Sequence, residues 1–180
     1  AARRDCGLEE APTLGILATL RDWKGHVYLL EAWRQLARTH PRWRLLVIGD
    51  GPQREALEAR VDAAGLRGSV RFVGNRDDVP RWLPCLDIKA LPSFGDEGVP
   101  QSILQAMACA VPVVSTPIGA IAEAVDDGVT GLLVPPRDSA ALAAALARLM
   151  DDAALRRRMG DAGRAAALER FGLDRMLDGM

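Results

Sequence analysis

Two loops in this sequence combine residue types that bind anionic groups. The first, Arg21-Asp22-Trp23-Lys24-Gly25, places two cations immediately before a predicted helix over 25–38. The helix dipole disfavours cations at that end, and an anion docked on the free backbone amides would remove the conflict. Alternatively, the loop is simply solvated and Asp22 neutralises one charge. The sequence leaves both interpretations open.

The second loop, over 92–102, is the richer of the two. It follows a predicted buried strand and opens a predicted helix over 99–109. Pro100 suits the first helical turn, because its missing N–H would be unpaired there in any case. The amides of Gln101 and Ser102 would then point out of the helix end, where an anion could accept from them.

Two side chains beside this helix end could act on such a ligand. Glu97 lies just before it, and Gln105 follows Gln101 by one turn on the same face. An acid, a row of amides and a side-chain amide could converge on one crevice; equally, Glu97 could merely cap the helix. The sequence contains no D-x-D and no carboxylate cluster suited to a divalent cation, so we expect no metal site and no cofactor.

The elements that must position these loops are short apolar runs alternating with amphipathic stretches. The expected strands cover 13–20, 43–48, 69–73, 86–91, 112–115 and 131–134, and the expected helices cover 25–38, 53–64, 79–83, 99–109, 121–125, 139–150 and 152–170. This alternation predicts an α/β fold, a Rossmann-like doubly wound sheet of about six parallel strands with helices on both faces. Ligands of such sheets bind beyond the carboxyl ends of the strands, where both loops lie.

Composition limits the remaining choices. The chain has 180 residues, 49% hydrophobic and 26% charged, which indicates a folded globular protein. A net charge of -1 does not favour nucleic-acid binding, and no apolar run is long enough to predict a membrane span. We expect one domain over 13–170, a linker remnant over 1–12 and the start of a truncated C-terminal helix over 171–180, with no core face evident from Arg164 onward.

Other reactive residue types show no chemical pattern. Cys6, Cys85 and Cys109 have neither CxxC nor zinc spacing, which indicates reduced thiols in a cytoplasmic protein. His26 and His40 lack metal-ligand spacing and are expected to have core or surface roles, and the four tryptophans are expected to pack. The sequence has no Ser/His/Asp order and no P-loop. No GxGxxG follows the first strand, where 21–25 stands instead, and this argues against nicotinamide dinucleotides.

Four segments occur in an order that is typical of one family: ATLRDWKGH, LLVIGDGPQREAL, VRFVGNRDDVPRWLPCLDIKALPS and EGVPQSILQAMACAVPVVSTPIGAIAEAVDDGVTGLLVPPRD. Together they resemble the C-terminal, donor-binding domain of GT-B glycosyltransferases, and more narrowly the retaining family 4. The resemblance covers about 14–150. It implies a nucleoside-diphosphate-sugar donor of UDP or GDP type, no metal, and a missing N-terminal domain that binds the acceptor.

The resemblance also implies roles for single residues. Lys24 and Arg21 match the pair that grips the donor diphosphate, although the family's arginine is more often five places before the lysine, where this chain has Thr19. Glu97 matches the first acid of the E-x7-E motif, which faces the donor sugar. Gln105 takes the place of the second acid, where it can hydrogen-bond the ribose hydroxyls without a charge.

Further donor-binding positions follow from the same resemblance. The loop whose backbone borders the base corresponds to Gly74, Asn75 and Arg76. The segment that meets the sugar and phosphate corresponds to Gly98, Val99, Gln101 and Ser102.

The function implied is a retaining, metal-independent glycosyltransferase that moves a sugar to an acceptor such as a bacterial glycan or a lipid-linked sugar. It would work in the cytoplasm, where the full-length protein could touch the cytosolic face of the membrane, and the 180-residue chain alone would be inactive. Two alternatives stay open. One is an enzyme resembling UDP-sugar 2-epimerases on the same fold; the other is a non-catalytic nucleotide-binding module, motivated by Gln105 and the missing domain.

Overall fold

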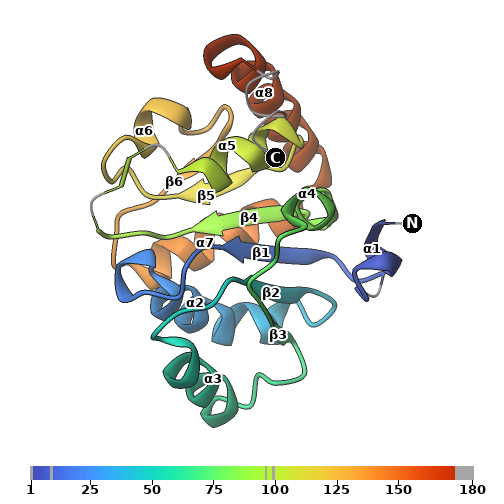
Figure 1. The fold of residues 1–180 in the computed structure, drawn as a ribbon, viewed down its shortest axis with the longest axis vertical. Helices are drawn as coiled ribbons and strands as arrows, with labels where there is room; N and C mark the ends of the chain where they lie inside the picture. Colours follow the sequence, from blue (N-terminus) through green and yellow to red (C-terminus); the bar gives the residue numbers. More distant parts are fainter. Residues whose placement is uncertain (1, 9, 96, 99, 173–180) are drawn as a thin grey trace.

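The computed structural model describes residues 2–8, 10–95, 97–98 and 100–172. Within these residues a single all-parallel sheet has the order β3-β2-β1-β4-β5-β6 (Figure 1). The strands are β1 (Thr13–Leu17), β2 (Arg44–Ile48), β3 (Val70–Gly74), β4 (Ile88–Leu91), β5 (Val113–Ser115) and β6 (Gly131–Leu133). The expected doubly wound α/β fold is therefore confirmed.

Helices cover both faces of this sheet. They are α1 (Ala2–Asp5), α2 (His26–Thr39), α3 (Arg54–Ala63), α4 (Val79–Trp82), α5 (Gln101–Ala108), α6 (Ile121–Ala124), α7 (Ser139–Asp151) and α8 (Ala153–Phe171), with short 3-10 turns η1 (Asp22–Lys24) and η2 (Leu83–Cys85). Figure 1 shows α5 in front of the sheet and α7 behind it. On the two faces α7 packs against α2, and α8 packs against α5.

The first strand ends three residues earlier than its apolar run predicts. Beyond Leu17 the chain still follows β2, since the Ala18 amide donates to the Ile48 carbonyl and the Leu20 amide donates to the Asp50 carbonyl. Leu20 is fully buried. The apolar side chain of Leu20 is therefore buried in the loop and does not mark continuation of the strand.

The core lies between the central strands and both helical layers. Leu14 and Ile16 of β1 and Ile48 of β2 are completely buried, and each such side chain contributes about 1.5–3 kcal/mol through removal from water. Trp33 of α2 is also completely buried, and its Nε1 donates to the Ser69 hydroxyl at 3.0 Å. Trp43 and Trp82 are buried as well, so packing is confirmed for three of the four tryptophans.

The segment expected as a linker remnant contains α1 and makes tertiary contacts. The Arg3 guanidinium donates to the Asp87 carboxylate at the start of β4, and Cys6 is buried. The Asp87 carboxylate also accepts from the Thr13 amide at 2.8 Å. These contacts join α1 to the amino ends of β1 and β4.

The C-terminal helix α8 packs partly through small residues, and Ala167 gives it a buried position beyond Arg164, where no core face was expected. Gly160, Gly163 and Ala167 of α8 are buried. A Cβ on Gly160 would lie 2.1 Å from the Ala110 carbonyl oxygen, so the backbones approach closely there. The last turn is anchored by the Arg170 guanidinium, 2.8 Å from the Asp126 carboxylate. The expected C-terminal segment 171–180 lies outside the described residues after Gly172.

Candidate functional site

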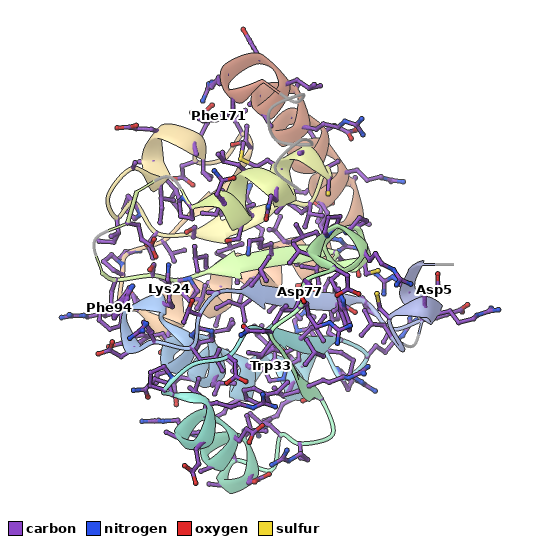
Figure 2. All side chains as sticks on the ribbon, viewed as in Figure 1. Asp5, Lys24, Trp33, Asp77, Phe94 and Phe171 are labelled. Atoms are coloured by element: carbon purple, nitrogen blue, oxygen red, sulfur yellow. The ribbon has the colours of Figure 1, made fainter. Side chains whose placement is uncertain are left out.

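The two loops singled out by their residue types meet at the carboxyl edge of the sheet. One follows β1 and contains η1; the other follows β4 and leads to α5. The Trp23 carbonyl accepts the Phe94 amide at 2.8 Å and the Ser93 hydroxyl at 2.9 Å. In Figure 2 Lys24 and Phe94 lie next to each other at this edge, whereas Asp5 lies at the opposite one. Because β1 and β4 are neighbours in the sheet, these loops flank its topological switch point.

Two glycines allow the loops to come this close. Gly25, at φ +82°, has Pro92 so near that a Cβ would lie 1.9 Å from its carbonyl oxygen. Gly119, at φ +56°, packs in the same way on Glu97. A Cβ at Gly119 would lie 1.8 Å from the Glu97 carbonyl oxygen. Any side chain at either position would push the loop backbones apart. The positions of Lys24 and Glu97 therefore depend on glycine next to each of them.

Lys24 and Glu97 form an ion pair at the centre of the site. The distance from Lys24 Nζ to Glu97 Oε1 is 2.6 Å, and the Ser93 hydroxyl lies 2.7 Å from the same oxygen. The side chains are 19% and 9% exposed. The pair is thus partly shielded from water yet reachable by a ligand, which makes its electrostatics stronger than those of a surface pair.

The N-terminus of α5 follows Glu97 closely in the chain. Pro100 precedes the helix in an extended conformation (φ −67°, ψ 128°), so its predicted place in the first helical turn is wrong by one residue. Its carbonyl accepts the first helical bonds, from Ile103 and Leu104, and the amides of Gln101 and Ser102 precede those bonds. Val99, at the expected helix start, lies outside the described residues.

The other described residues to which the family resemblance gives a role differ in their exposure. Arg21 is exposed, with its guanidinium 5.4 Å from the Trp23 ring centroid. Trp23 is itself 37% exposed and does not pack in the core. Gly98 is exposed, and Gln105 is half-buried on α5. Their roles toward a donor stay predictions.

The expected base loop forms a separate group in the described structure. Gly74 ends β3 at φ +70°, and its carbonyl accepts the Gly49 amide at 2.9 Å. Arg76 lies 3.1 Å from the Asp78 carboxylate and stacks over the Trp82 ring at 4.8 Å. Asn75 is exposed. No hydrogen bond or ion pair among the described residues joins this loop to Lys24 or Glu97.

Two buried bases lie behind the ion pair, and the sequence analysis recognised neither as part of a site. Lys89 of β4 is fully buried and His26 of α2 is 4% exposed; within the described residues, Lys89 Nζ and both His26 ring nitrogens lack a hydrogen-bond partner. Burial, together with the Lys24 charge, lowers the pKa of Lys89 to about 7. Burial, followed by the charges of Lys24 and Lys89, lowers the pKa of His26 to about 4. The signal for Lys89 was a single lysine inside the apolar run 86–91.

No group of three or more potential metal-ligating side chains occurs in the part of the chain that the structure describes. None of the described helices combines the length and apolarity needed to cross a bilayer.

The strand order defines a Rossmann-like domain, and its switch point carries Lys24, Arg21 and the N-terminus of α5. Comparison with known proteins places the domain in a family. Residues 11–152 match the family described as Glycosyl transferases group 1, and the chain belongs to this family.

Three known proteins illustrate the relationship. Alpha-D-kanosaminyltransferase from Streptomyces kanamyceticus is 32% identical over 162 residues, which are 88% of this chain and 42% of that protein. The crystal structure of HepE from Anabaena in complex with UDP has a TM-score of 0.88 at 27% identity, covering 98% of this chain and 49% of HepE. The C-terminal domain of LpcC from Francisella tularensis has a TM-score of 0.86 at 29% identity, covering 94% and 91%. The chain thus spans less than half of the first two proteins and nearly all of an isolated C-terminal domain.

Proposed function

We propose that this chain is the donor-binding half of a retaining, metal-independent glycosyltransferase of family 4. The donor is a nucleoside-diphosphate sugar, and the acceptor is a glycan or a lipid-linked sugar bound by a separate domain. The observation that carries the proposal is the Lys24–Glu97 pair, 2.6 Å apart at the switch point and adjacent in sequence to the first amides of α5. This arrangement offers a cation and backbone donors to a diphosphate, and an acid to a sugar.

Each group has a chemical task in this proposal. Lys24, with Arg21 from the same loop, offsets the negative charge that develops on the departing nucleoside diphosphate. The amides of Gln101 and Ser102 hold phosphate oxygens at the helix N-terminus. Glu97 accepts hydrogen bonds from hydroxyls of the sugar and so orients it. The bond between the anomeric carbon and the phosphate oxygen breaks in this position. The leaving phosphate accepts the acceptor's proton on the same face of the sugar, which retains the anomeric configuration.

The nucleoside is assigned to the remaining positions. Gln105 hydrogen-bonds the ribose hydroxyls, and the backbone of Gly74, Asn75 and Arg76 borders the base. The HepE complex with UDP supports a nucleoside diphosphate as ligand of this fold, and uracil is the base we propose here. Because the chain spans 42–49% of the two longer proteins compared above, transfer itself is assigned to the complete two-domain protein.

The test is a thermal-unfolding titration of the chain with UDP, GDP and ADP, each with and without EDTA. Ligand at ten times its dissociation constant adds about 1.4 kcal/mol to the free energy of unfolding, which raises the midpoint by about 3–6 °C. We expect that rise with UDP, unchanged by EDTA. Lys24→Ala removes a charge-assisted interaction of about 1.5–3 kcal/mol and should weaken UDP binding by about 10- to 150-fold.

Arg38→Ala is the matched control, because Arg38 is an exposed cation near the C-terminal end of α2, away from Lys24. It should leave the UDP response intact. A UDP response that vanishes with EDTA would overturn metal independence. Equal responses of Lys24→Ala and the unsubstituted chain would overturn the proposed site.

A further inference from the structure

We propose that Lys89 is a proton-accepting member of the donor site. Binding of the anionic diphosphate beside Lys24 drives uptake of one proton from solvent onto the buried Lys89 amine, which then supplies a second positive charge behind the ligand. The inference rests on the proposed function, because it requires a nucleoside diphosphate at Lys24.

In the free chain the Lys89 amine is buried and has no partner in the described part of the chain. Lys89 lies in the middle of the sheet, on β4 between β1 and β5, and is completely buried. Its Nζ has no hydrogen-bond partner among the described residues. A buried ammonium without a partner is strongly disfavoured, so burial favours the neutral amine. A nearby anion would shift this balance toward the ammonium. An apolar side chain of similar length would pack as well as Lys89 and would not bury an amine. Packing alone therefore does not explain a lysine at this position.

The charge that acts on this amine comes from Lys24 and not from its neighbours in the sheet. Its register neighbours, Gly15 on β1 and Val113 on β5, carry no charge, and α5 carries no ionisable side chain. The charge that acts on Lys89 is that of Lys24 in η1, which lowers the pKa of Lys89 in addition to burial. His26 of α2 responds to both lysines. Lys89 is therefore within electrostatic reach of the proposed diphosphate position.

The sign of the effect follows from these charges. In the free chain the Lys24 ammonium repels a proton from Lys89, and Glu97 balances Lys24 at 2.6 Å. A bound diphosphate replaces repulsion with attraction, because its negative charge exceeds the single positive charge of Lys24. With a free pKa of about 7, Lys89 is mostly neutral at pH 8, so there is room for a proton to be gained. His26 stays neutral at that pH and does not contribute.

The composition of the chain allows a direct test. Lysine occurs only at positions 24 and 89, so protein labelled with 13C at the lysine Cε carbon shows two resonances in its NMR spectrum. Lys89→Met assigns them, and Lys24→Arg assigns them independently should the methionine variant fail to fold. The chemical shift of Cε reports the protonation of the adjacent amine. We would titrate the labelled chain with UDP at pH 8, where the diphosphate is fully ionised.

The expected result is that the Lys89 resonance moves from its neutral toward its charged position, by about half of the full titration shift or more. Lys89→Met should bind UDP about five- to tenfold more weakly at pH 7.5, and Leu91→Met, a volume-conserving change on the same strand, should not. If the Lys24 resonance moves with UDP and the Lys89 resonance does not, this inference is overturned while the proposed function stands. If UDP moves neither resonance at saturating concentration, the proposed function itself fails.

Discussion

At the amino edge of the sheet Asp87 and His40 have polar partners, whereas toward the carboxyl edge two buried bases have none among the described residues. Asp87 accepts from both Arg3 and the Thr13 amide, and His40 lies 2.8 Å from Asp151 where α2 and α7 end. By contrast, Lys89 inside β4 and His26 at the start of α2 lack partners within the described residues.

This contrast separates stability from function. A buried polar group without a partner costs free energy, and such groups occur more often at functional sites than elsewhere in a fold. Two glycines with left-handed backbones also differ in the space around them. Gly25 at the carboxyl edge is pressed against Pro92, while Gly65, after α3, has open space around its missing side chain.

The largest effect is expected from alanine at these two glycines. Gly25→Ala combines a left-handed backbone at φ +82° with a Cβ 1.9 Å from the Pro92 oxygen, and should cost about 3 kcal/mol or more. Gly65→Ala keeps only the backbone penalty at φ +68°, about 1–2 kcal/mol. Urea denaturation measures both. Equal losses in the free energy of unfolding would show that the backbone around Gly25 relaxes to accept the methyl group without an energetic penalty.

The next effect is the acid sensitivity contributed by His26. Its pKa is lowered to about 4 in the folded chain, against about 6.5 in the unfolded chain, so the unfolded chain takes up the proton first as the pH falls. The contribution of His26 to the free energy of unfolding is therefore fully present above pH 6.5. It is lost as the pH falls from 6.5 to 4, by up to about 1.4 kcal/mol per pH unit. His26→Leu should flatten this part of the stability profile, measured by denaturation at several pH values. An unchanged slope would place the sensitivity elsewhere.

The smallest effect concerns competition within the site. Glu97 forms an ion pair with Lys24, the cation that the diphosphate is proposed to contact. Glu97→Gln should therefore tighten UDP binding by about three- to tenfold, which corresponds to about 1 kcal/mol for a partly shielded pair. Isothermal calorimetry measures the change. Asp87→Asn removes a carboxylate charge from the amino edge and should leave the UDP affinity unaltered. Weaker binding in Glu97→Gln would mean that the acid holds Lys24 in position rather than competing with the ligand.

Much of the fold could be predicted because its strands are continuous apolar runs and its helices are amphipathic. The strand over 86–91 was found within two residues, as was the helix that became α2. The four-residue helix α1 could not be predicted, because it has no apolar period and is held by Arg3 against Asp87.

The candidate site was only partly legible. Loop residue types placed Lys24 and Glu97 at the same edge of the sheet, but 73 positions separate them. Their contact depends on β1 lying beside β4, which is a matter of strand order. The single lysine inside the apolar run 86–91 did not by itself predict a buried amine, because a lysine in a short strand can equally extend its amine into water.

The central claim is that the carboxyl edge, and not the amino edge, binds the nucleotide. The most direct measurement is the set of amide NMR shifts of the 15N-labelled chain during titration with UDP. The account predicts saturable shifts at Lys24, Gly74, Gly98, Gln101 and Ser102, with Arg3, Thr13 and Asp87 unmoved. Shifts concentrated at the amino edge, or no shifts at millimolar UDP in a folded sample, would contradict it.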